Sequence, residues 1–244
     1  MMNPPRTIAA SSRYGTPTAD NQHDVLFNFG ILLMPLSGLL ALFADVRVAA
    51  WIRNNPFSPL FKTVLRQLRW PGHYGFTVVL AVLIVWPFRR HWRIAAALLI
   101  AGAGSSAVTA VLKYCFGRAR PFRGDSAFAW HPFPGSPLDS LITRNLSFPS
   151  GDATLAFATA AVLTVAFPRL RYVALGWAVV VAITRVLQGA HYPSDVAVGA
   201  IVGIVCGSWT CRAIGLPVDN ISGSKTVLAN QFESTAASTE RTQV

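Results

Sequence analysis

The chain has 244 residues, of which 52% are hydrophobic and only 13% are charged. Soluble domains carry about 25% charged residues, so the composition argues against a water-exposed globule, and the apolar content excludes disorder for most of the chain. Lys and Arg number 21 against 10 Asp and Glu, a formal net charge of +11. Because the charges lie between apolar runs, we expect them to meet membrane lipids and phosphates, with no nucleic-acid partner.

Polar segments flank the apolar part of the chain. Residues 1–23 and 216–244 have the composition of flexible tails, so we predict one transmembrane domain over residues 24–215 between them. The first tail has no apolar core after a basic start, which argues against a secretory signal.

Six apolar stretches lie between the tails. A helix needs about 20 apolar residues to span a bilayer, with about 17 as the lower limit. We predict helices at about 25–43, 73–88, 94–114, 151–167, 170–187 and 196–209. The second and sixth are marginal in length, and short apolar helices can also be buried core helices, but flanking aromatic residues suit membrane interfaces. The predicted fold is all-α: a six-helix transmembrane bundle with an extramembrane loop on the catalytic side.

Two further patterns concern the surface and the packing of this bundle. Apolar residues recur at helical spacing over Phe57–Leu68, which predicts an amphipathic helix in the membrane surface, although a core-facing helix of a soluble domain has the same pattern. Gly199, Gly203 and Gly207 repeat every four residues along the sixth stretch. Glycines on one stripe predict a close approach between helix backbones.

Three polar clusters interrupt the apolar pattern, and charged groups at such positions are costly unless they are paired or functional. They lie at 113–121, 148–152 and 184–195. If the helices alternate in direction, all three clusters share one membrane face. They then bring together Lys113, Arg118, Arg120, Ser150, Asp152, Arg185, His191 and Asp195. Cations neutralise a phosphate dianion, and the amides at a helix start bind its oxygens.

The spacing between His191 and Asp195 adds a nucleophile to this set. A carboxylate four residues after the histidine can accept its Nδ1–H, which leaves Nε2 free to attack phosphorus. Taken singly, these residues also have ordinary roles: Lys113 can extend to the membrane interface, and Ser150 can cap a helix. For Ser150 we expect both the cap and the phosphate contact.

The three clusters resemble the type 2 phosphatidic acid phosphatase family, in its membrane branch of lipid phosphatases. The family pattern is KxxxxxxRP, PSGH and SRxxxxxHxxxD, and this sequence has matching segments at 113–121, 149–152 and 184–195, with Thr184 in place of Ser. The resemblance covers roughly residues 25–212. It implies that His191 forms a phosphohistidine that water hydrolyses and that Asp195 orients His191. It also implies a set of phosphate-binding residues: Lys113, Arg120, Ser150, Gly151 and Arg185.

The sequence departs from the family pattern at Asp152, where the family has the histidine that protonates the leaving oxygen. A carboxylate in water is ionised at neutral pH and is repelled by a phosphate dianion. Three accounts remain open. Burial and phosphate charge keep Asp152 protonated so that it acts as the acid; the leaving group departs easily, as from a diphosphate; or the protein is a weakly active or non-catalytic phospholipid-binding relative. His131, in the connecting segment, is a further candidate for the acid.

The resemblance therefore implies an integral membrane phosphatase that acts on a lipid phosphate or a lipid diphosphate. A lipid phosphotransferase on the same scaffold is the alternative. Acidic residues are few and unclustered, so we expect catalysis without a metal or another cofactor. Basic loops near 89–93 and 168–171 lie opposite the predicted site, and positive loops favour the cytoplasm. Segment 45–70 points the other way, because its five basic residues (Arg47, Arg53, Lys62, Arg66 and Arg69) lie on the face of the site. We still expect a plasma or inner membrane protein whose site faces away from the cytoplasm, as the family's does.

Overall fold

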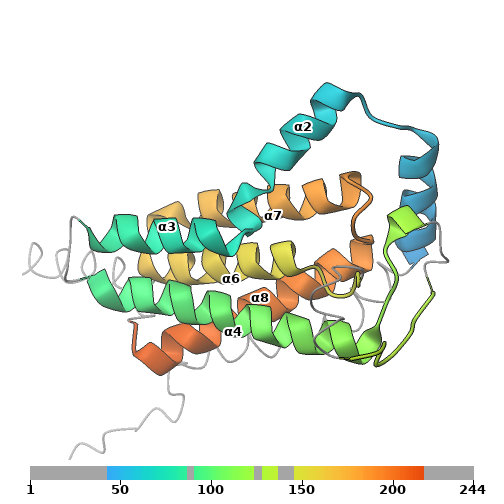
Figure 1. The fold of residues 1–244 in the computed structure, drawn as a ribbon. Helices are drawn as coiled ribbons and strands as arrows, with labels where there is room; N and C mark the ends of the chain where they lie inside the picture. The colour runs from blue at the N-terminus through green and yellow to red at the C-terminus, as the bar shows by residue number, and fades with distance from the viewer. Residues whose placement is uncertain (1–42, 87–90, 124–127, 137–145, 217–244) are drawn as a thin grey trace, which may run out of the picture.

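The computed structural model describes residues 43–86, 91–123, 128–136 and 146–216 (Figure 1). Within these ranges the protein is all-helical, and its β-structure is limited to two isolated bridges. The predicted first helix and both predicted tails lie outside the described residues, apart from Phe43 at the end of that helix and Leu216 at the start of the second tail. The count of six membrane helices is therefore not confirmed, and the domain boundaries stay a prediction.

The described helices follow the predicted order. Residues 43–54 are helical, and six labelled helices follow: α2 (Pro59–Leu68), α3 (Tyr74–Val85), α4 (Trp92–Phe116), α6 (Gly151–Ala166), α7 (Arg171–Leu187) and α8 (Pro193–Ile214). Short 3₁₀ turns connect some of them: η1 (Trp70–Gly72), η3 (Pro121–Arg123) and η4 (Pro168–Leu170).

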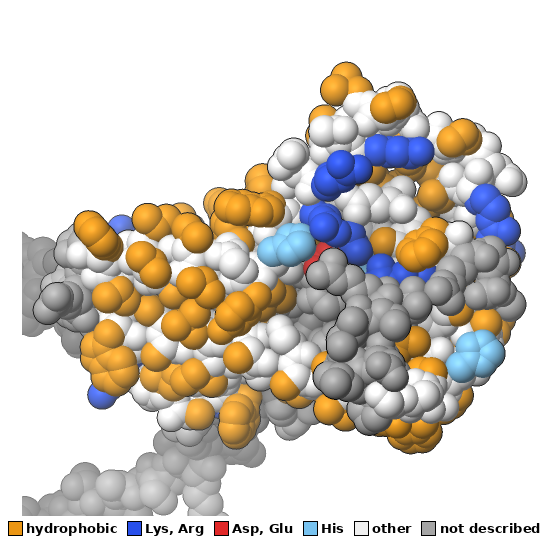
Figure 2. Space-filling model, in the orientation of Figure 1, with side chains coloured by type: hydrophobic (Ala, Val, Ile, Leu, Met, Phe, Trp, Pro, Cys, Tyr) orange, Lys and Arg blue, Asp and Glu red, His pale blue; other side chains and the backbone are white. Residues whose placement is uncertain are grey.

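Three of these segments are long and apolar enough to cross a membrane: Trp92–Phe116, Pro168–Leu187 and Pro193–Ile214. Helices α3 and α6 are apolar but shorter. Large apolar side chains are exposed around the bundle, and Figure 2 shows them spread over the face in view. An apolar exterior of this extent suits contact with lipid.

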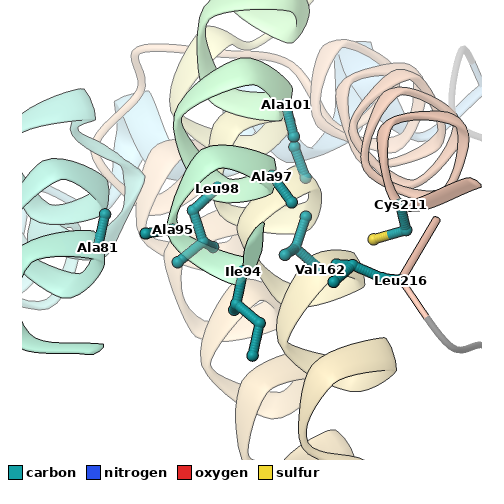
Figure 3. Close-up of a cluster of buried hydrophobic side chains, with 10 residues drawn as sticks. Ala81, Ile94, Ala95, Ala97, Leu98, Ala101, Val162, Cys211 and Leu216 are labelled. Atoms are coloured by element: carbon teal, nitrogen blue, oxygen red, sulfur yellow. The ribbon is translucent and has the colours of Figure 1, made fainter. Parts of the chain in front are cut away.

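Helix α6 is the central helix of the bundle. Helices α4, α7 and α8 all pack against it, and α3 packs against α4. Its ten residues Ala153–Val162 are all buried. An apolar cluster at the end of the bundle away from the polar clusters joins Leu98 of α4, Val162 of α6 and Cys211 of α8 (Figure 3).

The glycine stripe of α8 confirms the predicted close helix contact. A Cβ atom on Gly203 would lie 2.2 Å from the Thr154 carbonyl oxygen of α6, and one on Gly207 would lie 2.6 Å from the Ala158 oxygen. Only a hydrogen atom fits at these positions. The α8 backbone therefore lies directly on α6, which fixes the start of α8 relative to the start of α6.

Helix α2 confirms the predicted amphipathic helix. Its N-cap Ser58 accepts a hydrogen bond from the Phe61 amide at 3.2 Å, and Leu65 is its buried residue. It projects away from the bundle axis on the side of α7 (Figure 1). Its position in a membrane surface stays a prediction.

Candidate active site

One end of the bundle collects the polar clusters. The end of α4, the start of α6, the end of α7 and the start of α8 meet there, as alternating helix directions predict (Figure 1). A cavity of about 430 Å³ lies at this end, lined by Arg69, His73, Arg120, Asp152 and Arg185. Figure 2 shows basic side chains gathered at one end of an otherwise largely apolar face, with an acidic side chain and a histidine beside them.

His191 is buried, with 3% of its surface exposed. Its Nδ1 lies 2.8 Å from the carbonyl oxygen of Ser147 and 3.6 Å from Oδ2 of Asp195. The hydrogen-bond acceptor is therefore the carbonyl, whereas we expected the carboxylate. Because a carbonyl oxygen can only accept, Nδ1 carries the proton, and Nε2 of the neutral ring keeps its lone pair.

The surroundings of His191 hold it in the neutral form. Burial lowers the pKa of His191 to about 4, with Lys113 and Arg185 lowering it further and Asp195 opposing them. The ring is therefore uncharged at neutral pH. A buried, unprotonated imidazole beside cations has the properties of a nucleophile toward an anionic phosphate.

Asp195 organises the start of α8. Its Oδ2 accepts hydrogen bonds from the Tyr192 amide at 2.8 Å and from the Ser147 hydroxyl. Its Oδ1 accepts one from Nη1 of Arg118 at 2.7 Å. Ser147 therefore contacts both Asp195, through its hydroxyl, and His191, through its carbonyl.

Arg118 lies in the protein interior, although its sequence position suggested a cavity cation. It is 0% exposed, and its guanidinium joins Asp195 to Asp45, with Nη2 2.7 Å from Oδ2 of Asp45. The guanidinium also stacks on the Tyr192 ring, with Cζ 4.1 Å from the ring centroid. Two buried carboxylates and one buried cation thus hold the helix at 43–54 against the start of α8.

Lys113 reaches the same carbonyl as His191. Its Nζ donates hydrogen bonds to the Leu146 oxygen at 2.8 Å and to the Ser147 oxygen at 3.3 Å. The ammonium group is therefore held next to the predicted nucleophile, where it can bind a phosphoryl oxygen.

Ser150 precedes α6 but does not cap it, which differs from the expected double role. Its side chain makes no capping hydrogen bond, and its buried hydroxyl has no partner among the described residues. Its backbone is fixed instead, because the Ser150 amide donates to the Asp195 carbonyl at 2.9 Å. The amides at the start of α6, including that of Gly151, are the usual anion-binding end of a helix. An unpartnered hydroxyl beside them is suited to a phosphate oxygen.

Arg185 and Asp152 form an ion pair at the cavity, with Nε 2.9 Å from Oδ2. Arg69 adds a second guanidinium, with Nη1 3.8 Å from the same oxygen. Nη1 of Arg185 donates to Gln188 at 2.6 Å. Arg120 lines the same cavity. The predicted phosphate-binding arginines are therefore brought together, and Asp152 lies among them.

A second cavity, of about 480 Å³, reaches His191 from the side of α2. Most of its lining is apolar, with three cations among the lining residues. The apolar part includes Val48, Ile52, Phe57, Phe122, Val186 and Leu187, and the cations are Arg53, Lys62 and Arg66.

Several functional neighbours have no signal in the sequence. Asp45 contacts Arg118 and Ser194 across more than 70 residues of chain. Ser147 lies in the segment before the second motif, and His73 and Arg69 lie before α3, in a region that the family pattern leaves out. Their contacts and positions next to the predicted site residues in three dimensions identify them. Within the described ranges, no group of three His, Cys, Asp or Glu side chains could hold a metal ion.

Comparison with known proteins identifies relatives of this chain. It is 40% identical over 101 residues to the lipid A 1-phosphatase of Rhizobium johnstonii, a match that covers 41% of this chain and 37% of that protein. It is 34% identical over 144 residues to the decaprenylphosphoryl-5-phosphoribose phosphatase of Mycobacterium tuberculosis, which covers 56% of this chain and 64% of that one. The chain thus spans less than two thirds of the length of these curated relatives.

Two solved structures share the fold. LpxE of Aquifex aeolicus has a TM-score of 0.53 at 24% identity, over 69% of this chain and 94% of that one. A PAP2 type phosphatidylglycerolphosphate phosphatase of Bacillus subtilis has a TM-score of 0.55 at 22% identity, over 77% and 92%. The family model of the PAP2 superfamily matches residues 90–216, which contain all three motifs. This confirms the resemblance found in the motifs: the chain belongs to the PAP2 superfamily.

Proposed function

We propose that this protein is an integral membrane phosphatase that hydrolyses a lipid phosphate or a lipid diphosphate without a metal ion. The observation that carries the proposal is the environment of His191, a buried neutral imidazole that lines the second cavity and whose Nδ1 is bound to a carbonyl oxygen, within electrostatic reach of Lys113 and of Arg185, which lines the first cavity. This arrangement supports attack by Nε2 on a phosphorus atom that the cations hold in place.

The reaction has two steps. In the first, Nε2 of His191 forms a bond to phosphorus while the phosphorus–oxygen bond to the lipid breaks, and the leaving oxygen takes up a proton. In the second, water attacks the phosphohistidine, the nitrogen–phosphorus bond breaks, and inorganic phosphate leaves. Three cations and the helix start are assigned to the phosphoryl oxygens: Lys113, Arg120, Arg185, Ser150 and the Gly151 amide.

Asp195 is assigned to the Nδ1 side of the His191 ring. Its Oδ2 lies 3.6 Å from Nδ1, and it stabilises the positive charge that the imidazole gains when it bonds to phosphorus. Asp152 is assigned to the site through Arg185, whose guanidinium it pairs with at 2.9 Å.

A lipid substrate is supported by the second cavity. It leads to His191 along mostly apolar walls, and its cations suit anionic headgroup atoms. The names of the relatives, a lipid A 1-phosphatase and a decaprenylphosphoryl-5-phosphoribose phosphatase, also favour lipid phosphates. The alternative, a lipid phosphotransferase, uses the same intermediate and passes the phosphoryl group to an acceptor hydroxyl.

Two basic connections support a site on the non-cytoplasmic face, although Arg53, Lys62, Arg66 and Arg69 lie at the site end of the bundle. Arg93, Arg169 and Arg171 lie at the end of the bundle opposite the site, because they begin α4 and join α6 to α7. Positively charged connections favour the cytoplasm.

The test measures the inorganic phosphate that the purified full-length protein releases from a panel of lipid monophosphates and diphosphates. The assay buffer contains a chelator. Wild-type protein releases inorganic phosphate, whereas His191→Ala releases none and forms no acid-labile phosphoenzyme. Product analysis with and without an added acceptor alcohol separates hydrolysis from transfer. Turnover by His191→Ala at the wild-type rate contradicts the proposed nucleophile.

A further inference from the structure

The proposed reaction needs a proton for the leaving oxygen, and Asp152 is poorly placed to supply it. The carboxylate is 2.9 Å from the Arg185 guanidinium and 3.8 Å from that of Arg69. Its Oδ2 atom is therefore engaged by two guanidiniums, which makes it less suited to meet the leaving oxygen of a substrate.

The cavity around Asp152 also contains a histidine. His73 lines it together with Arg69, Arg120, Asp152 and Arg185. The imidazole is partly exposed, and it makes no capping hydrogen bond to α3 although it occupies the N-cap position. The side chain of His73 therefore does not serve as the N-cap of α3.

The backbone around His73 is held against the start of α6. Gly72 is buried, and a Cβ atom placed on it would lie 2.8 Å from the Asp152 carbonyl oxygen and 2.9 Å from the Asp152 Cβ. The His73 amide donates to the Trp70 oxygen at 2.9 Å. One turn later, the Thr77 and Thr159 hydroxyls are 3.1 Å apart and join α3 to α6. His73 is thus the residue next to a tight contact with Asp152.

We propose that His73 is the proton donor to the leaving oxygen, in place of the histidine that the second motif lacks; this rests on the proposed phosphatase function. As Nε2 of His191 bonds to phosphorus, the bond to the leaving oxygen breaks, and the proton moves from the His73 imidazolium to that oxygen. The neutral imidazole then takes a proton from the water that attacks the phosphohistidine, which restores the starting state.

His73 shares its cavity with one carboxylate, that of Asp152, and with three guanidiniums, those of Arg69, Arg120 and Arg185. Imidazole gains and loses a proton close to neutral pH, so it can act as both donor and acceptor in one cycle. Asp152 lines the same cavity as His73 and pairs with Arg185.

His131 is the other histidine considered for this role. It is exposed, its backbone amide is bound to the Gly117 oxygen, and it is not among the residues that line either cavity at the site. It provides a matched control.

The experiment compares two substrates that differ in their need for an acid. Nitrophenyl phosphate has a leaving group that is stable as an anion, whereas a lipid alkyl phosphate such as phosphatidate needs its leaving oxygen protonated. We expect His73→Gln to lower kcat/KM for the alkyl phosphate by about 10²–10⁴-fold and for the aryl phosphate by less than about threefold. His131→Gln leaves both values unchanged.

The outcomes separate this inference from the proposed function. Loss of both activities in His191→Ala supports the function, and a selective loss in His73→Gln supports the donor. A His73→Gln protein with the wild-type melting temperature that loses both activities equally, or neither, overturns the donor and leaves the function standing. If His73→Gln lowers the melting temperature, His73→Asn is measured on the same two substrates and judged in the same way.

Discussion

The fully buried guanidinium of Arg118 gives the strongest stability prediction. Its Nη2 is 2.7 Å from Asp45 and its Nη1 is 2.7 Å from Asp195, and all three side chains are 0% exposed. Arg118→Met keeps much of the apolar volume but leaves two buried carboxylates without their cation. Removing one member of a buried ion pair costs about 3–5 kcal/mol, because the remaining charge is desolvated and unpaired.

This cost translates into a measurable change in melting temperature. Each kcal/mol lowers the melting temperature by about 2–4 °C in a protein of this size, so Arg118→Met should lower it by about 6–20 °C. Intrinsic tryptophan fluorescence of the detergent-solubilised protein, which has 7 tryptophans, follows the transition.

Arg120→Met is the matched control, two residues further along the same segment. Arg120 lines the cavity, so its replacement should abolish phosphate release and change the melting temperature by less than about 3 °C. If Arg118→Met melts within about 2 °C of the wild type, the buried ion pairs do not stabilise the start of α8 and the reasoning is wrong.

Three further predictions follow from other parts of the structure. Gly203→Ala places a Cβ atom 2.2 Å from the α6 backbone and should destabilise the protein by about 1–3 kcal/mol, whereas Gly104→Ala, with nothing within 4 Å, should be neutral or stabilising; thermal melting of both variants checks this. Because the pKa of His191 is lowered to about 4, the nucleophile stays unprotonated at neutral pH. Protonation of His191 should therefore lower kcat/KM only as the pH falls toward 4. The unfolded chain binds that proton near pH 6.5, so the free energy of unfolding should fall between about pH 6.5 and 4, and His191→Gln should remove this part of the pH dependence of melting. Phosphate release should be unchanged after dialysis against EDTA, and a loss that added Mg²⁺ or Zn²⁺ restores would contradict metal-independent catalysis.

Helix positions and their alternation could be predicted from the sequence because they depend on local apolar runs. The sixth helix is the instructive case. The apolar run alone predicts a start at Val196, but α8 starts at Pro193 because proline needs no amide partner at the first turn and Asp195 accepts the Tyr192 amide. Polar residues that cap a helix thus belong to it, although they end the apolar pattern.

Within the site, the motifs predicted which residues meet but not how they contact one another. Nδ1 of His191 binds the Ser147 carbonyl, and a backbone acceptor carries no sequence signal. Arg118 and Arg120 are two residues apart and chemically identical, yet one is buried and the other lines the cavity. Which arginine turns inward depends on Asp45, 73 positions earlier in the chain, and no local pattern contains that information.

The short length of α6 has a consequence for the choice of substrate. A methyl group on Gly151 would lie 3.7 Å from Cγ2 of Thr109, which is seven residues before the last residue of α4. At about 1.5 Å per residue, the anion-binding end of α6 is recessed by about 10 Å from the outer end of its neighbour. The proposed phosphate site would therefore lie below the outer end of α4, where we expect a terminal phosphate monoester to reach it more easily than a phosphodiester, which is substituted on both sides.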